Sequence, residues 1–436
     1  MSSRGAGDLS QSWRELRLTI LSEVVPSQMI DGEQLLRFID CLGSYGRLAC
    51  GGIYRPVYSG AWVEATEQLT RWMEHAGMCV RRDAAGNLWG LIEGDSPLPS
   101  VVAGSHIDTV TGGGQLDGAY GVLAAIVAAA ALQRCHGAPR RTLEVLAFCE
   151  EEGSRFSVSG WGCRAITGRI KPGEADGARD AEGVSIGDAM RGIGLDPGEL
   201  PTAVRKPSEI AAYLELHVEQ GGILEHMQVP IGVVTSIVGA TKMQIEVTGR
   251  QDHAGTTPMS LRRDALVGAS AMVVAIRGVA ASIGDPAVAT VGKLYIEPDQ
   301  INVVPGFVRF TVDVRHAGRE GQLELVRRIG EECEKVAEQH QLQVDVRVLR
   351  DSAPAPMHPD LINLLSATAQ DAGVPYALMP SGAGHDAKGM SHICPAAMLF
   401  VPSVDGRSHC PEEHTEPRDL VRGAELLARA LERLCY

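Results

Sequence analysis

Four short apolar runs, each bounded by glycine, proline or charged residues, are the most regular hydrophobic feature of the chain. They cover Ser100–Gly104, Thr142–Cys149, Ala212–Val218 and Ala396–Val401. Short, mostly apolar runs of this length are typical of buried strands. The runs therefore predict the central sheet of an α/β domain.

Helical spacing of apolar residues separates these runs. It is found at about 63–78, in an alanine-rich stretch at about 117–133, and at 416–434. A weaker helical period covers about 12–48, where Pro26 divides two pieces. Residues 156–204 are rich in glycine and charge, and they predict loops and short helices.

From Ile231 the pattern changes to alternation of apolar and polar residues, as in Met243, Ile245 and Val247. A helix at about 261–283, strands near 289–296 and 307–314, a helix at 319–340 and alternation at 343–349 follow. This βαββαβ order predicts a ferredoxin-like α+β domain inserted into the first one. The expected domains are a catalytic domain made of 1–230 and 351–436, and an inserted domain at 231–350.

Composition excludes several classes of protein. A formal charge of −14 leaves no basic footprint for a nucleic acid. The longest apolar run, Tyr120–Leu132, is too short to span a bilayer, and the N-terminus lacks a secretion-signal pattern, so no membrane partner is expected. Ten cysteines without CxxC spacing fit a cytoplasmic protein with reduced thiols.

Candidate metal ligands follow the first two buried runs. His106 and Asp108 come after the first run, a triple glutamate of residues 150–152 comes after the second, and Asp117 lies at the start of the helix between them. Ligands of open α/β sheets bind at the carboxyl ends of the strands. Imidazole and carboxylates that meet there suit zinc or a similar divalent ion.

Further residues extend this hypothesis. His217 and His409 also lie at predicted loop starts, and Asp108 is placed to accept the second ring N–H of His106. Adjacent residues point in different directions, so Glu152 can ligate while Glu151 serves as general base. The alternative is that the triple glutamate is a solvated loop.

Two segments look suited to hold a substrate. Asn302 precedes a strand that ends near Arg315, whose planar fork suits a carboxylate; an ion pair with Asp313 is the alternative. His253 lies in a glycine-rich loop and could polarise a carbonyl, or it could be an ordinary loop residue. The chain has no GxSxG, P-loop or HExxH motif.

Nine segments together resemble one known family from about Gly51 to the C-terminus. The chain is similar to the amidase, hydantoinase/carbamoylase family of dinuclear zinc hydrolases, which have a zinc-peptidase-like α/β catalytic domain with a mixed, mostly parallel sheet. The segments are GSHIDTV, GGGQLDGAYGV, EEEGSRF, ELHVEQG, DHAGTTPM, NVVPG, DVRH, SGAGHDA and DGRSHCPEE.

The resemblance implies roles for single residues. Two divalent ions would be bound, zinc first, with manganese, cobalt or nickel as alternatives. The implied ligands are His106, Asp117 as the bridge, Glu152, His217 and His409, the implied base is Glu151, and the implied substrate contacts are Gln220, His253, Asn302, Arg315 (on the α-carboxylate), Gly384 and His385.

The resemblance also carries expectations about conformation and assembly. It implies a cis peptide after Asp117, and an inserted domain that acts as a lid and as the contact of a homodimer. His253 would then act either in its own subunit or across the dimer. Where the family often has asparagine the chain has Cys410, and His414 competes with His409 as a ligand.

The implied reaction is hydrolysis of the carbamoyl C–N bond of a small ureido acid. An N-carbamoyl-L-amino acid or N-carbamoyl-β-alanine would give the amino acid, CO2 and ammonia. Allantoate is the alternative substrate, because it too combines ureido groups with a carboxylate. Two further possibilities are a dipeptidase-like aminopeptidase and a non-catalytic binding protein that keeps the fold.

Overall fold

The computed structural model describes residues 29–49 and 51–436 of the 436-residue chain. Helix α1 (Gly32–Leu42) agrees with the second piece of the predicted N-terminal helical region. Asp31 caps it by accepting the N–H of Gln34, and Leu35 and Ile39 are buried on one face. The first piece of that region and Pro26 lie outside the described residues.

The described chain forms two compact units. The large unit comprises residues 29–49, 51–235, 357–379 and 383–436, and the inserted unit comprises 236–356 and 380–382. The chain passes between them a few residues beyond the predicted boundaries at 230 and 350. Each unit has its own hydrophobic core.

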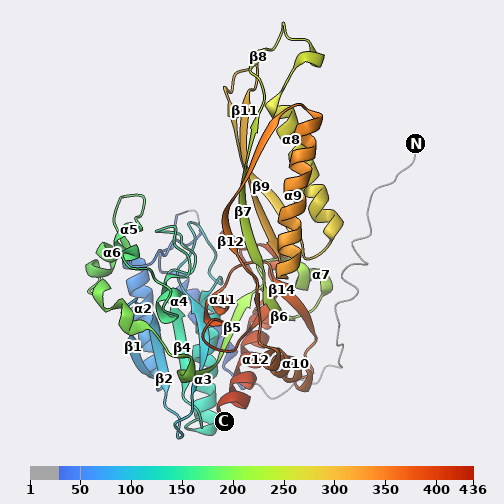
Figure 1. Ribbon diagram of the computed structural model, residues 1–436. Helices are drawn as coiled ribbons and strands as arrows, with labels where there is room; N and C mark the ends of the chain where they lie inside the picture. The colour runs from blue at the N-terminus through green and yellow to red at the C-terminus, as the bar shows by residue number, and fades with distance from the viewer. Residues whose placement is uncertain (1–28, 50) are drawn as a thin grey trace. The chain divides into compact units, whose positions relative to one another are not determined.

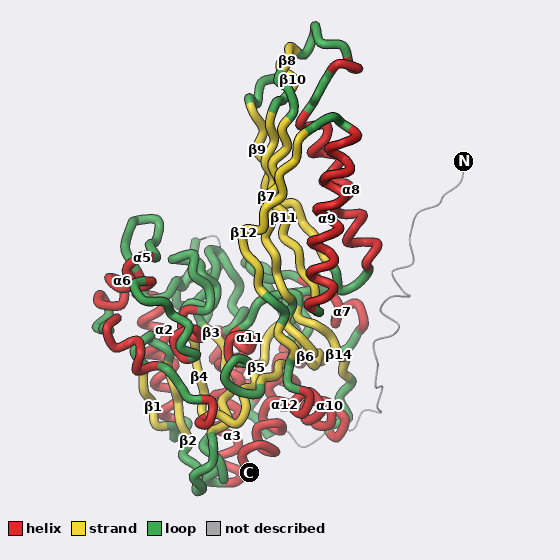
Figure 2. Tube along the Cα trace, viewed as in Figure 1, coloured by secondary structure: helices red, strands yellow, loops and turns green. Residues whose placement is uncertain are grey.

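The sheet of the large unit has the strand order β1-β2-β4-β3-β5-β15-β6, and β14 also pairs with β6. Strands β4, β3, β5 and β15 are parallel to one another, whereas β1, β2 and β6 pair antiparallel with their neighbours. Figure 2 shows the strands in yellow among the helices in red. The bounds are β1 (Cys79–Arg82), β2 (Leu88–Ile92), β3 (Ser100–His106), β4 (Leu143–Phe148), β5 (Ile210–Val218), β6 (Ile231–Ile237), β14 (Tyr376–Ser381) and β15 (Ala396–Val401).

The four parallel strands are almost completely buried, which explains their mostly apolar sequences. Helix α3 (Ala119–His136) packs on them with thirteen of its eighteen residues buried, and its alanines allow a close approach. Helix α12 (Pro417–Cys435) packs beside α3 with its leucine face. These elements fix the edge of the sheet at which β3, β4, β5 and β15 end.

Shorter helices complete the large unit (Figure 1). As predicted, residues 156–204 form only loops and short helices. The remaining helices of this unit are α2 (Gly60–His75), α4 (Trp161–Ile166), α5 (Glu174–Gly177), α6 (Ile186–Gly192), η1 (Pro197–Ala203), η2 (Pro207–Glu209), α7 (Ile223–Met227), α10 (Pro359–Asp371), α11 (Asp386–Met390) and η4 (Val404–Gly406).

The inserted unit has the chain order β7-α8-β9-β11-α9-β12, which is the predicted βαββαβ arrangement. Its antiparallel sheet has the order β12-β7-β11-β9, and the alternating Met243, Ile245 and Val247 enter its core. The bounds are β7 (Gly239–Thr248), β8 (Asp252–His253), η3 (Met259–Leu261), α8 (Ala265–Ile283), β9 (Val288–Glu297), β10 (Val303–Val304), β11 (Phe307–His316), α9 (Arg319–Gln339), β12 (Gln343–Ser352) and β13 (Ala355–Pro356).

Two helices of the described chain, α3 and α8, are long and apolar enough to cross a membrane by length and composition. Most of the apolar window of α3 is buried in the core of the large unit. Helix α8 packs against α9 and supplies core residues to the inserted unit. Burial in the core thus accounts for the apolar character of α3, whereas only 33% of the apolar window of α8 is buried.

Candidate metal centre and active site

Three groups of ligand side chains lie at the carboxyl edge of the large unit's sheet, and within each group the ligand atoms are within 4.8 Å of one another. Two of the groups share Asp117, and the third joins the first two through His106 and Glu152. All five implied ligands and Glu151 therefore converge, although they come from five separate segments. The groups are His106–Asp117–His217, Asp117–Glu152–His409 and His106–Glu151–Glu152.

The buried His106 and His217 present the same ring nitrogen to Asp117. His106, at the end of β3, has Nδ1 3.1 Å from the backbone oxygen of Asp108, and its Nε2 is 3.6 Å from Asp117 Oδ1. His217, near the end of β5, has Nδ1 2.8 Å from the oxygen of Val218, and its Nε2 is 3.1 Å from Asp117 Oδ1. A backbone carbonyl fixes the proton on Nδ1, so Nε2 keeps the lone pair that a metal ion requires; in His217 this lone pair accepts the backbone N–H of Gly118 at 2.9 Å.

His409 reaches Asp117 from the opposite carboxylate oxygen. Its Nε2 is 3.0 Å from Asp117 Oδ2 and 3.3 Å from Glu152 Oε1. Its backbone has φ +57°, and its side chain is half exposed, unlike the two buried histidines. Asp117 thus faces imidazoles on both of its oxygens, which is the arrangement of a bridging carboxylate.

The charges of the cluster favour the binding of cations. Burial would raise the pKa of Asp117, but the neighbouring His106, His217 and His409 hold that pKa well below its usual range. Hydrogen bonds to Asp117 and Glu152 raise the pKa of His409 to about 10. The buried carboxylates thus demand positive charge, which divalent ions bound to the same nitrogen and oxygen atoms would supply.

The three consecutive glutamates have different surroundings. Glu150 is fully buried, and its Oε1 accepts the N–H groups of Arg155 and Phe156, so it shapes the loop. Glu151 and Glu152 turn toward the cluster. The solvated-loop alternative fails for this segment.

The contacts of the Asp108 carboxylate differ from those that the sequence predicts. Its own backbone oxygen, not its carboxylate, is nearest to His106 Nδ1, since the carboxylate Oδ1 is 3.7 Å away. The carboxylate instead accepts the backbone N–H groups of Glu151 at 3.0 Å and Glu152 at 3.1 Å. Asp108 thereby holds together the loops that follow β3 and β4.

Glu151 is surrounded by other acids. Burial raises its pKa well above the usual range, His106 opposes the rise, and Asp386 adds to it. Both carboxylate oxygens of Asp386 are buried and have no hydrogen-bond partner among the described residues. A carboxyl group in such surroundings holds a proton readily, which is what a proton-transferring group needs.

The predicted substrate residues of the large unit also lie at this edge. Gln220 donates from Nε2 to Asp117 Oδ2 at 2.7 Å. An added Cβ at Gly384 would lie 3.9 Å from Glu151 Oε1. The ring of His385 is 4.5 Å from that of His217, and burial together with this neighbour lowers the pKa of His385 well below its usual range.

The other three predicted substrate residues belong to the inserted unit. His253 lies on β8, and its Nδ1 accepts the N–H groups of Gly255 and Thr256. Asn302 lies beside it, because its backbone oxygen accepts the N–H of Ala254. Arg315, on β11, pairs with Asp313 through two N–H groups, so the ion pair that was the alternative interpretation is present.

The structure corrects the expected cis peptide after Asp117 and decides between His409 and His414 as a ligand. Within residues 29–49 and 51–436 the cis peptides are Asp285–Pro286 and Glu297–Pro298, so the implied cis bond after Asp117 is wrong here. Gly118 instead has φ +64°, and an added Cβ would overlap the ring of His106. His414 is exposed and belongs to none of the three ligand groups, which favours His409.

Sequence reasoning missed Glu413. It is buried beside Asp117, whose N–H it accepts at 3.0 Å. The signal was present in the segment DGRSHCPEE, where two acids follow the ligand histidine. Nothing in that pattern distinguishes the buried Glu413 from the exposed Glu412.

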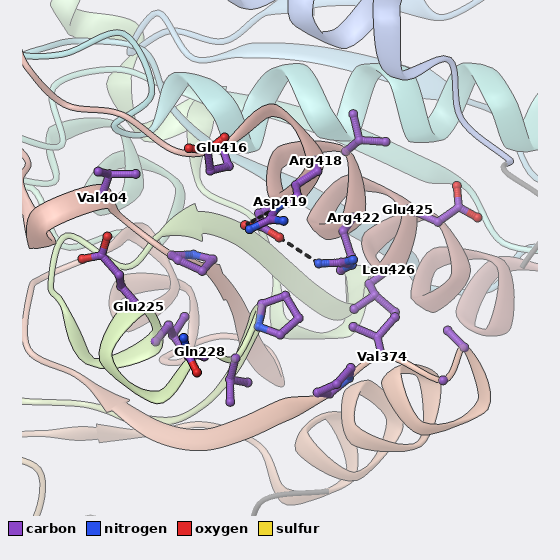
Figure 3. Close-up of a pocket in the computed structure, with 18 of the residues that line it drawn as sticks. Glu225, Gln228, Val374, Val404, Glu416, Arg418, Asp419, Arg422, Glu425 and Leu426 are labelled. Carbon is purple, nitrogen blue, oxygen red and sulfur yellow. Dashed lines mark hydrogen bonds and ion pairs between the residues drawn. The ribbon is translucent and has the colours of Figure 1, made fainter. Parts of the chain in front are cut away.

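A hollow of about 910 Å³ in the large unit is separate from the ligand cluster (Figure 3). Residues of α7, α12 and the segment around Val374 line it, and Arg422 pairs with Asp419 across 2.8 Å at its wall. No ligand of the cluster lines this hollow. The chemistry therefore belongs to the cluster at the strand ends.

Comparison with known proteins identifies the family. Residues 101–433 match the model of peptidase family M20/M25/M40. The chain belongs to this family. Among its M20 relatives, the N-carbamoyl-L-amino-acid amidohydrolase of Paenarthrobacter aurescens is 41% identical over 88% of this chain and 93% of its own length. The allantoate amidohydrolase of Escherichia coli (strain K12) is 38% identical over 91% and 96%.

Solved structures agree with this membership. An amidase of the hydantoinase/carbamoylase family from Burkholderia multivorans has a TM-score of 0.88 and 32% identity, over 94% of this chain and 98% of that one. The resemblance carried by the nine sequence segments, and the expected fold with its inserted domain, are confirmed. M20 membership and the donor set together make the cluster a divalent-metal site.

Proposed function

We propose that the chain is a dinuclear amidohydrolase that cleaves the carbamoyl C–N bond of an N-carbamoyl-L-amino acid or N-carbamoyl-β-alanine. The observation that carries the proposal is the shared Asp117, with two ligand groups on its two oxygens. Its relatives at 38–41% identity are named as N-carbamoyl-L-amino-acid and allantoate amidohydrolases. The products would be the amino acid, CO2 and ammonia.

His106, Asp117, Glu152, His217 and His409 would hold two ions, zinc first, with manganese, cobalt or nickel as alternatives. Bound ions supply Lewis acidity and lower the pKa of water. Glu151 takes the proton from the attacking water and delivers it to the leaving nitrogen. The buried acids around Glu151 support this role, because they favour its protonated form once it has accepted the proton.

Substrate recognition is assigned to both units. Arg315 would bind the carboxylate, since a guanidinium has five N–H donors and three are used by Asp313 and the oxygen of Gly382. His253 would polarise the carbamoyl oxygen, with Asn302 beside it. Gln220, Gly384 and His385 would complete the contacts near the ions.

The inserted unit supports a homodimer. Arg315 pairs with Ala240, at the start of β7, whereas His253 follows the far end of that ten-residue strand (Figure 1). At about 3.3 Å per residue the two side chains are roughly 30 Å apart. One small ureido acid cannot contact both within a subunit, so His253 and Asn302 would serve the active site of a second copy.

Subunit complementation tests this assignment. His253→Ala and Arg315→Ala variants, each inactive alone, are mixed under conditions that exchange subunits. If His253 acts across the dimer, each mixed dimer has one intact site, and roughly a quarter of wild-type activity returns. No recovery, although mixed dimers have formed, would place both residues at the same subunit's site.

Substrate choice requires direct assay. Ammonia release is measured with N-carbamoyl-L-amino acids, N-carbamoyl-β-alanine and allantoate on the zinc- or manganese-loaded protein. Turnover of allantoate alone would replace the leading choice by allantoate amidohydrolase, which the relative from Escherichia coli favours. Turnover of dipeptides but not of ureido acids would instead make the chain an aminopeptidase.

The binding-protein alternative predicts that Glu151→Gln changes nothing, because no bond is broken. The hydrolase proposal predicts loss of turnover with both metal equivalents retained. The cytoplasm is the proposed compartment: the nine cysteines of the described residues are all free, as expected for a reducing environment.

A further inference from the structure

Glu413 joins two separate loops of the ligand cluster. It follows β15 in the chain, four residues beyond His409, and is only 7% exposed. Its Oε1 accepts the backbone N–H of Leu116 at 2.8 Å and that of Asp117 at 3.0 Å. Its Oε2 accepts the hydroxyl of Ser408 at 2.6 Å. One carboxylate thus binds the residue next to His409 and the backbone of the shared aspartate.

The side chain of Glu413 packs closely against the backbone of Gly114. An added Cβ at Gly114 would overlap the Cβ and carboxylate atoms of Glu413, so the loop before Asp117 needs glycine there. The glycine-rich run 112–114, which gave no motif by itself, thereby acquires a physical reason at one position. The two loops therefore pack closely where Glu413 meets Gly114.

The hydroxyl of Ser408 lies between the carboxylates of Glu413 and Asp117. Its hydroxyl is 2.6 Å from Glu413 Oε2 and 3.2 Å from Asp117 Oδ2. A hydroxyl donates one proton, and the shorter contact identifies Glu413 as the acceptor. Asp117 Oδ2 is therefore not consumed by Ser408 and can serve an ion.

The two groups on Asp117 depend on this carboxylate to different degrees. His106 and His217 lie on buried strands, and backbone carbonyls hold their Nδ1 atoms. His409 lies on a loop, and its ring is half exposed. Besides the direct contact of His409 with Asp117, the tie from Glu413 through Ser408 holds this loop next to the backbone of Asp117.

We propose that Glu413 is a positioning residue that sets the distance between Asp117 and His409 and so builds the ion position Asp117–Glu152–His409. The inference rests on the proposed dinuclear function. It predicts that loss of Glu413 weakens one of the two metal equivalents selectively. Groups that orient metal ligands typically contribute 10- to 100-fold in metal affinity.

The test counts zinc on the purified holoenzyme. Wild type, Glu413→Ala, Glu413→Gln and the control Glu412→Ala are dialysed against a series of chelator concentrations, and the retained zinc is measured by mass spectrometry. Glu412 is a matched control because it is the adjacent acid, its side chain is 58% exposed, and it pairs with Arg407 at the surface. An exposed pair of this kind contributes little.

Glu413→Ala is expected to lose one equivalent at 10- to 100-fold lower chelator concentration and to keep the other like wild type. Glu413→Gln keeps an oxygen for the two N–H groups and can donate to Ser408, so it should restore most of the lost affinity. Ser408→Ala removes one contact and should weaken the same equivalent by a smaller factor. Glu412→Ala should match wild type.

Two results would overturn the inference. One is wild-type affinity for both equivalents in Glu413→Ala; the other is equal weakening of both, which indicates a general structural role. If Glu413→Ala does not fold, Ser408→Ala decides the question by the same criterion. Failure of the proposed function is separate, because it appears in the wild type as fewer than two equivalents or no ureido hydrolysis.

Discussion

Replacement of Asp108 by asparagine separates two explanations of this residue. The sequence suggests that its carboxylate fixes the ring of His106, whereas the structure has that carboxylate accepting the N–H groups of Glu151 and Glu152. The backbone oxygen of Asp108, which is 3.1 Å from His106 Nδ1, is retained in the variant. Asp108→Asn should therefore disturb the glutamate loop and leave the histidine in place.

The expected loss follows from the two hydrogen bonds. Asparagine keeps one acceptor oxygen and turns an amide NH2 toward the other backbone N–H of this fully buried site. A hydrogen bond to a charged acceptor contributes about 1.5–3 kcal/mol, and a buried N–H without a partner costs about 1–3 kcal/mol. Because these terms overlap, we expect a loss of about 2–4 kcal/mol in the free energy of unfolding.

Urea unfolding of the chelator-treated protein measures this loss of stability. Zinc retention shows whether His106 still binds metal. Asp371→Asn is the control, because its side chain is 65% exposed and pairs with Arg433 at the surface; its effect should stay within about 0.5 kcal/mol. For Asp108→Asn we also expect kcat to fall at least about tenfold as Glu151 moves. Unchanged stability with weakened zinc binding would refute the reasoning.

Three further variants test separate contacts. Gly118→Ala places a Cβ on the ring of His106 at a backbone of φ +64°, so zinc affinity should fall at least about tenfold; unchanged zinc retention would contradict the overlap. The second variant, Glu219→Gln, tests a buried carboxyl group whose pKa burial raises to about 7. Because the folded protein binds this proton more tightly than the unfolded chain, the free energy of unfolding should fall by about 3 kcal/mol as the pH rises from about 4.5 to 7. Urea unfolding at pH 5 and 8 should lose that slope in Glu219→Gln, and an unaltered slope would exclude this carboxyl as its source. The third variant, Arg205→Leu, removes the guanidinium that donates two hydrogen bonds to the buried Glu144, and the free energy of unfolding in urea should fall by about 3–5 kcal/mol. A loss below about 1 kcal/mol would show that Glu144 does not need this ion pair.

The fold could be predicted wherever one physical signal dominates. The parallel strands are buried on both faces, so their sequences are mostly apolar, and the half-exposed strands of the inserted unit alternate. Boundaries were less accurate, because β3 extends to His106 and β6 continues the large sheet beyond residue 231. Pairing between strands distant in the chain decides these limits, and no local pattern records it.

The same reasoning explains what could be predicted of the site. His106 and the glutamates were accessible to sequence analysis because they follow predicted strands, and Asp117 because it begins the helix between them; the carboxyl ends of parallel strands meet. The direction in which each carboxylate turns was not accessible. Asp108 faces backbone N–H groups, Glu150 turns into its own loop, and Glu413 returns to the Asp117 turn from almost three hundred residues away.

Those three carboxylates share one physical purpose. Each accepts backbone N–H groups of a loop that carries a ligand or the proposed base, and each is buried, so at least one of its oxygens faces protein N–H groups instead of water. A cluster of acids that must stay close together before any cation binds needs such anchors, because mutual repulsion would otherwise separate the loops. The acidic motifs of this sequence thus contain two kinds of acid, one for the ions and one for the backbone, and only the folded chain distinguishes them.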